Sequence, residues 1–143
     1  MDPIQVVIDT NVMVASFRSR RGASFALLQR LRDPGWRTNI SATLILEYEM
    51  ALKRDAVARG IPLWVAETIL DTMVMAGNRR CIFFRWRPFL PDPKDDFVLE
   101  LAVASGAPFI ITYNCRDFEG AETFGIQAIR PSEFLRMLGV SYP

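Results

Sequence analysis

Acidic side chains are the groups of this chain that could do chemistry. Asp9, Glu47 and Asp96 lie far apart in the sequence, and Asn114 and Asp117 follow a late hydrophobic run. There is no histidine, which excludes Ser-His-Asp and Cys-His nucleophiles and imidazole-ligated metal sites. Carboxylates that are brought together repel one another, and the usual remedy is a hard divalent cation with oxygen ligands. The inventory favours Mg2+ or Mn2+, which in an oxygen-only site can activate water and stabilise phosphoryl oxygens.

Asp9 stands at the end of a short hydrophobic strand. It follows the β-branched run 6–8 and precedes Thr10 and Asn11. This pattern predicts a buried strand with a carboxylate at its carboxyl end, followed by a turn into a helix. In open α/β sheets, ligands bind at that edge. The alternative is that Asp9 only caps the next helix, and the strand by itself does not decide between the two roles.

Glu47 lies on a predicted helix over 42–54, which Ser41 would cap. At about 100° per residue, Glu47 falls at the margin of the apolar face, whereas Glu49 points to the polar side with Lys53. Glu47 can therefore lean toward the edge of the sheet. The alternative is an ordinary solvated glutamate.

Asp96 closes a group of three acids, with Asp92 and Asp95, before a predicted helix over 97–105. The helix macrodipole and its free amides favour acids at this position. That preference could explain one of the three acids, but it explains the presence of all three less well. Asp96 is therefore the third site candidate.

Strands alternate with helices along the whole chain. Besides the first strand, strands are predicted at 36–39, 80–84, 108–112 and 124–129, and helices at 12–17, 23–31, 42–54, 63–76, 97–105 and 131–135. Such alternation implies a parallel sheet covered on both faces. The loop 85–94, with three prolines, is expected at the surface.

The composition is that of one globular domain spanning 1–143. Half of the 143 residues are hydrophobic and 23% are charged. The start lacks the features of a signal peptide, no apolar run reaches membrane-spanning length, and the two cysteines have no metal-binding spacing, so we expect a cytoplasmic protein without zinc. Most basic residues are arginines, including Arg18, Arg20 and Arg21, and arginine suits phosphate contacts.

Several blocks together resemble the PIN domain ribonucleases, and among them the PIN-family toxins of toxin–antitoxin systems, relatives of the VapC type. The blocks are VIDTNV at 7–12, SATLILEYE at 41–49, DPKDDFVLELA at 92–102, ITYNCRDF at 111–118, FGI at 124–126 and PSEF at 131–134. The resemblance implies a three-layer α/β/α sandwich with a mostly parallel sheet of about five strands. It also implies a Mg2+- or Mn2+-dependent endoribonuclease in which Asp9, Glu47 and Asp96 are the catalytic metal ligands and Asn11 supports the first of them.

One position departs from the pattern. Many PIN domains have aspartate where this chain has Asn114, so the fourth acidic position is neutral unless Asp117 supplies it. The departure leaves open whether one or two metal ions bind. We expect Asn114 to contact a metal-bound water or a phosphate, and Asp117 to be a secondary residue.

The partners expected are RNA, a cognate antitoxin and further copies of the chain in a dimer or higher oligomer, with no membrane. Arg18, Arg20 and Arg21 would guide the RNA backbone. Two alternatives stay open: a non-catalytic RNA- or protein-binding module with a degenerate metal site, and a nuclease that processes RNA without being a toxin. A phosphotransferase is disfavoured because there is no P-loop and no GxGxxG after the first strand.

Overall fold

The computed structural model describes residues 2–82 and 90–142. Within them the strands are β1 (Ile4–Ile8), β2 (Trp36–Ile40), β3 (Asn78–Arg79), β4 (Phe109–Ile111) and β5 (Gln127–Ile129). The α-helices are α1 (Thr10–Arg18), α2 (Ala23–Leu28), α3 (Ala42–Arg59), α4 (Leu63–Ala76), α5 (Asp96–Ser105) and α6 (Pro131–Met137). Three short 3-10 turns are η1 (Pro93–Asp95), η2 (Cys115–Phe118) and η3 (Ala121–Phe124).

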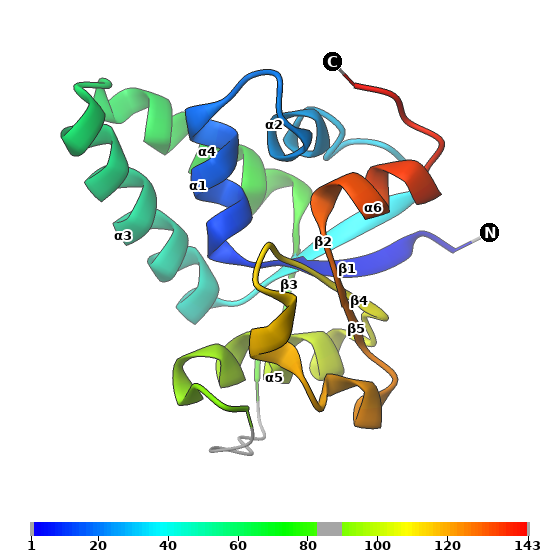
Figure 1. Ribbon diagram of the computed structural model, residues 1–143. Coiled ribbons are helices and arrows are strands. Elements are labelled where there is room, and N and C mark those ends of the chain that lie inside the picture. Colours follow the sequence, from blue (N-terminus) through cyan, green and yellow to red (C-terminus); the bar gives the residue numbers. More distant parts are fainter. Residues whose placement is uncertain (1, 83–89, 143) are drawn as a thin grey trace.

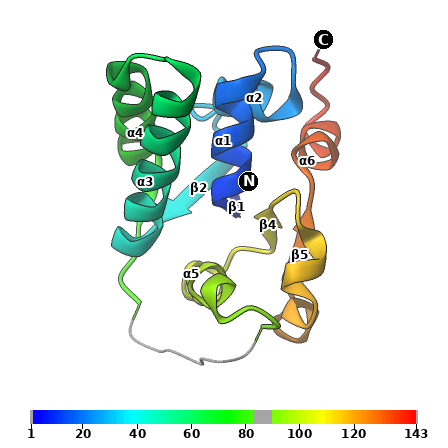
Figure 2. The ribbon, with the colours of Figure 1, turned by 60° about the vertical axis from the view of Figure 1, so that its left-hand side comes forward.

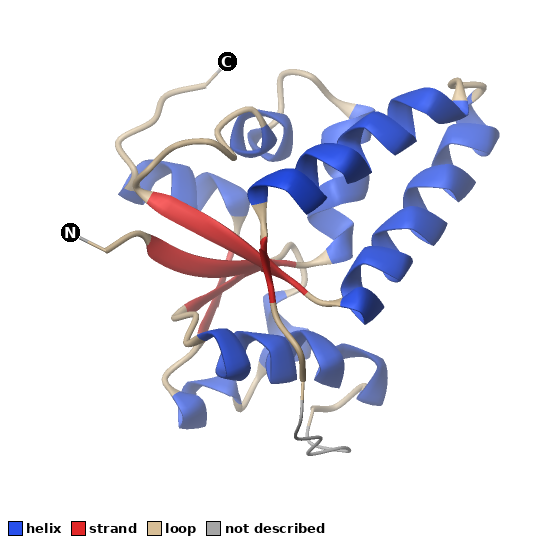
Figure 3. Ribbon diagram, turned by 180° about the vertical axis from the view of Figure 1, so that it is seen from behind, coloured by secondary structure: helices blue, strands red, loops and turns tan. Residues whose placement is uncertain are grey.

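The described strands form one parallel sheet in the order β3-β2-β1-β4-β5. Helix α5 covers one face, and α1, α2, α4 and α6 lie on the other, with α3 packed beside α4 and α1 (Figures 1 and 2). The same two helical layers appear from behind, on either side of the strands (Figure 3). The predicted α/β/α sandwich with a parallel sheet of about five strands is confirmed.

The centre of the sheet forms the core. Val6, Val7 and Ile8 of β1 are fully buried, because helices cover both faces of a parallel sheet. Beside them, the Trp36 and Phe134 rings pack edge to face with centroids 5.5 Å apart. Since all strands are parallel, β1 and β4 end at the same edge, with Ile8 beside Ile111.

Helix boundaries depart from the sequence-based prediction mainly at carboxyl ends. Helix α3 continues to Arg59, five residues beyond the predicted end, and stops at Gly60 with a φ of 67°, a conformation that glycine adopts without a Cβ clash. Helix α4 has the predicted bounds. Helix α2 ends at Leu28 rather than at residue 31.

The strand predicted at 80–84 is found earlier, as β3 at Asn78–Arg79, and residues 83 and 84 lie outside the described residues. So do residues 85–89 of the predicted loop, whereas Pro93–Asp95 form η1. No helix in the described part of the chain has the length and hydrophobicity to cross a membrane.

Candidate active site

Asp9 lies at the carboxyl end of β1 and is 8% exposed. Its Oδ1 accepts a hydrogen bond from the Thr10 backbone N–H at 2.9 Å, so it does cap α1 as expected of a residue in this position. Its other oxygen, Oδ2, accepts a 2.8 Å hydrogen bond from the Thr112 hydroxyl. Asp9 is therefore a cap and, at the same time, a buried carboxylate held from the neighbouring strand.

Asn11 and Thr112 complete a polar network between β1 and β4. The Asn11 amide donates to Thr112 Oγ1 at 3.1 Å and to Asp9 Oδ2 at 3.4 Å, and its oxygen accepts from the Tyr113 N–H at 3.2 Å. The Asn114 N–H also donates to Thr112 Oγ1, at 3.0 Å. Asn11 and Thr112 therefore both donate to Asp9 Oδ2. Thr112 was not predicted as a site residue, although its place directly after a buried strand beside β1 was a usable signal.

Glu47 comes from the first half of α3 and reaches the same edge. The next residue, Tyr48, is fully buried and donates a hydrogen bond to the Ile8 carbonyl oxygen, directly before Asp9. Glu49 instead pairs with Lys53 at 3.1 Å on the outer side of the helix. The helical phase predicted for Glu47 and Glu49 agrees with these positions.

The third acid that lines the cleft is Asp95, one residue before the predicted Asp96. Asp95, at the end of η1, faces the same site, whereas Asp96 is 2% exposed and its Oδ1 accepts a 2.8 Å hydrogen bond from the Leu90 N–H. The 3-10 turn ahead of α5 sets this register, and consecutive residues at a helix start point in directions about 100° apart. Asp95 therefore takes the position expected of Asp96.

These side chains line one cleft of about 440 Å3 between α1 and α3. The acidic and amide residues at its sheet end are Asp9, Asn11, Glu47, Asp95, Asn114 and Asp117. Of the three arginines predicted to contact RNA, Arg18 lines the cleft, whereas Arg20 and Arg21 are exposed in the turn after α1. Arg54, which was not predicted as a site residue, lines it as well.

Comparison with known families supplies the identification. A family model described as "PIN domain" matches residues 5–116, which include every acid of the cleft except Asp117. The chain belongs to the PIN domain family. PIN domains are generally metal-dependent nucleases, so the chain is assigned at this level to the nucleases, a class of hydrolases.

A solved structure has the same fold as this PIN domain. It is a PilT N-terminus domain protein from the hyperthermophilic archaeon Sulfolobus solfataricus P2, with a TM-score of 0.56 and 16% sequence identity over 98% of each chain. No curated protein matches the sequence.

Burial and like charge raise two pKa values in the PIN domain site. Burial raises the pKa of Asp9 to about 6, with smaller contributions from Glu47 and Asp117, against the hydrogen bonds from Thr112 and Thr10 that lower it. Burial followed by the Asp9 and Asp117 charges raises the pKa of Asp95 to about 7. Near neutral pH a proton or a cation must therefore offset the repulsion within the cleft.

The donor set fits a hard divalent cation of the kind that PIN domains typically bind. The side chains offer carboxylate and amide oxygens, and the buried Thr10 hydroxyl has no hydrogen-bond partner among the described residues. Among those residues no three acids or cysteines converge closely enough to enclose one ion. Because Asp9 is fixed by the network, the side chains of Glu47, Asp95 and Asp117 would have to move inward to complete such a site.

Proposed function

We propose that this PIN domain is a Mg2+- or Mn2+-dependent endoribonuclease whose metal ligands are Asp9, Glu47 and Asp95. The observation that carries the proposal is the convergence of acids from β1, α3 and the start of α5 on one cleft. Asp95 replaces Asp96 in the ligand set because Asp96 is turned toward the Leu90 N–H. When bound, the cation would supply an acidified water and stabilise charge on the phosphoryl oxygens.

The residues of the site have distinct tasks. Thr112 and Asn11 orient the Asp9 carboxylate, so that one ligand is in place before substrate arrives. Asn114 and Asp117, on the loop after β4, face the same cleft and supply a further contact to a water or to the substrate phosphate. The neutral Asn114 gives the loop side of the site one acid fewer than many PIN domains have.

The same proposal includes a biological role as the toxin of a toxin–antitoxin pair in the cytoplasm, with a cognate antitoxin and a homo-oligomer as partners. Its support is the resemblance of the sequence blocks to PIN-family toxins. A short neighbouring gene for a DNA-binding antitoxin would support this role. Its absence would favour a nuclease that processes RNA without being a toxin.

Cleavage of a labelled single-stranded RNA tests the activity. We expect cleavage that requires Mn2+ or Mg2+ and falls by at least about a hundredfold in Asp9→Asn, because one fixed anionic ligand is lost. Glu49→Gln is the matched control: it also removes one carboxylate from the chain, but on the outer face of α3, and should cleave like the parent.

Two outcomes would contradict the proposal. Cleavage that survives both chelation and Asp9→Asn would not come from this site. A parent protein that binds RNA but never cleaves it with either cation would instead be a non-catalytic binding module.

A further inference from the structure

The end of the cleft away from the sheet is basic. Asn11 and Arg18 lie seven residues apart on α1, and Glu47 and Arg54 lie seven apart on α3. Both helices start at the sheet edge and run away from it side by side (Figures 1 and 2). Seven helical residues span about 10 Å. Each arginine therefore lies about that far along its helix from the acidic end.

Small apolar residues separate the two ends of the cleft. They are Val14, Ala15 and Ala51. Their short side chains leave room for a polymer to lie along the cleft between α1 and α3. The lining therefore changes from acidic through apolar to basic along one direction.

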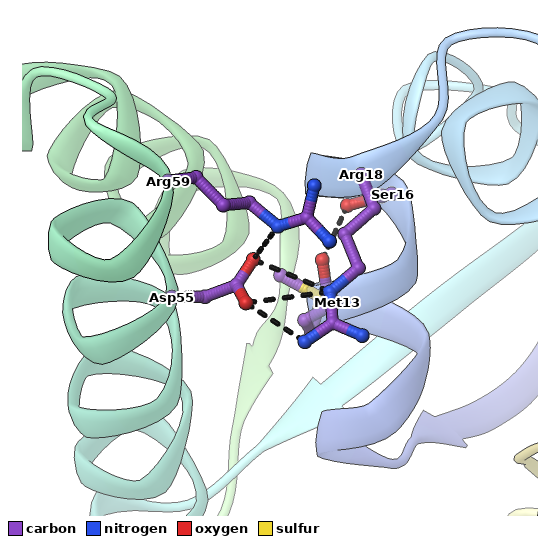
Figure 4. Close-up of polar contacts among 5 residues, drawn as sticks. All are labelled: Met13, Ser16, Arg18, Asp55 and Arg59. Carbon is purple, nitrogen blue, oxygen red and sulfur yellow. Dashed lines mark hydrogen bonds and ion pairs between the residues drawn. The ribbon is translucent and has the colours of Figure 1, made fainter.

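Arg18 is held in place by a buried carboxylate of the opposite helix. Its Nη2 lies 2.8 Å and its Nε 3.3 Å from Asp55 Oδ1, and Arg59 Nε lies 3.2 Å from Asp55 Oδ2 (Figure 4). Asp55 is 7% exposed, and the Arg18 hydrogen bond is the main cause that lowers its pKa. Two guanidinium groups on one carboxylate leave a net positive charge.

Both arginines keep hydrogen-bonding capacity. Arg18 contacts Asp55 through Nε and Nη2, and its Nη1 has no hydrogen-bond partner in residues 2–82 and 90–142. About half of the Arg18 side chain is exposed, so a ligand can reach Nη1. Arg54 is exposed and makes no hydrogen bond or ion pair within the same ranges. Guanidinium groups that are fixed in place and retain N–H donors suit a phosphate diester.

We propose that Arg18 and Arg54 form a phosphate subsite, which binds a backbone phosphate of the RNA strand flanking the phosphate at the acidic end. The subsite rests on the proposed function and adds to it the path of the strand, along the cleft between α1 and α3. Asp55 is a positioning residue, because it touches Arg18 rather than the RNA. Arg59 holds Asp55 from the other side.

Binding of a short fluorescein-labelled single-stranded RNA, followed by anisotropy in the Asp9→Asn background, tests the subsite without cleavage. Adding Arg54→Ala should weaken binding about tenfold and lower the slope of log affinity against log salt by about 0.7, the value for one lost phosphate contact on a single strand. Arg136→Ala is the matched control, since Arg136 is exposed on α6 and does not line the cleft. Equal effects of Arg54→Ala and Arg136→Ala would overturn the subsite.

The positioning role of Asp55 has a separate readout. Asp55→Asn should weaken binding by the same factor as Arg18→Ala, and the double variant should bind no worse than Arg18→Ala alone. If Asp55 were merely structural, the losses of RNA affinity in Asp55→Asn and Arg18→Ala would add in the double variant. The slope of log affinity against log salt would then be unchanged by Asp55→Asn. Arg18→Lys should restore part of the affinity, because it keeps the charge.

The two levels of the proposal fail differently. Absence of RNA binding by both the parent and the Asp9→Asn protein would overturn the nuclease proposal together with the subsite. RNA binding that persists unchanged after Arg18→Ala and Arg54→Ala would overturn the subsite alone.

Discussion

Asp9 and Asp95 face the same cleft but are held in opposite ways. Asp9 is buried and accepts hydrogen bonds from Thr10, the first residue of α1, and from Thr112, the residue directly after β4. Asp95 lies at the end of a 3-10 turn, is partly exposed and makes no side-chain capping bond to α5. One half of the site is therefore preorganised, and the other can adjust when an ion or substrate binds.

The largest expected effect separates Asp95 from its neighbour. Asp95→Asn should weaken Mn2+ binding about a hundredfold, because the site loses one anionic ligand, and leave the unfolding temperature nearly unchanged. Asp96→Asn should bind Mn2+ like the parent but lose about 1 kcal/mol of stability, because it weakens the buried hydrogen bond to Leu90. Calorimetric titration and thermal unfolding of both variants check the pair. Weaker Mn2+ binding in Asp96→Asn than in Asp95→Asn would instead show that Asp96 is the ligand.

The second prediction concerns pH in the absence of divalent cations. The pKa of Asp9 is about 6 in the folded protein and 3.8 ordinarily, so the folded state holds this proton more tightly than the unfolded state does. The free energy of unfolding should therefore fall as pH rises from about 4 to about 6, by up to about 3 kcal/mol from Asp9. Asp95, with a pKa of about 7, extends the decline toward pH 7 by a smaller amount, since it is partly exposed.

Denaturant titrations at several pH values measure this slope. Asp9→Asn should lack most of the decline between pH 4 and 6. Saturating Mn2+ should reverse the decline in the parent, because the cation then replaces the protons. A stability that rises with pH in both proteins would contradict the assignment of a raised pKa to Asp9.

Thr112→Val would make Asp9 more like Asp95. The variant removes the hydroxyl that donates to Asp9 Oδ2 and that Asn11 and Asn114 donate to, with little change in volume. We expect the pKa of Asp9 to rise further and Mn2+ affinity to fall about tenfold, as is usual when a group that orients a ligand is lost. Thr112→Ser keeps the hydroxyl and serves as the control. Equal metal binding in Thr112→Val and the parent would show that Asp9 needs no support from β4.

The smallest expected effect lies on the loop after β4. Asn114→Asp adds a fourth carboxylate and should tighten Mn2+ binding by about threefold to tenfold. Asp117→Asn should reduce cleavage at limiting metal, with partial recovery in excess Mn2+. A loss of folding in Asp117→Asn at every metal concentration would show Asp117 to be structural and would remove it from the site.

The site residues at the end of β1 and on α3 were the predictable ones. A β-branched strand that precedes Asp9, and an apolar face on α3 that sets the helical phases of Glu47 and Glu49, are both local patterns of the sequence. Asp95 and Asp96 are adjacent acids at a helix start, where local sequence does not say which one faces the cleft. The contact between η1, α5 and the Leu90 backbone decides it.

The basic end of the cleft could not be predicted for a different reason. Its contacts join Arg18 on α1 to Asp55 on α3, residues that are 37 apart in sequence and that no local period connects. The helix prediction also ended at residue 54, so the turn that carries Asp55 and Arg59 was left out of α3. Pairing of two helices across a cleft is a property of the packed structure.

The buried hydrogen bond from Tyr48 to the Ile8 carbonyl links two carboxylates that are 38 residues apart. Burial raises the pKa of Tyr48 well above its ordinary value, so its phenol keeps the proton that it donates. Docking of α3 on β1 therefore brings Glu47 into the cleft that Asp9 lines, and neither helix formation nor strand formation alone does so. A nascent or partly unfolded chain then lacks nuclease capacity, and activity should disappear in the same transition as the fold.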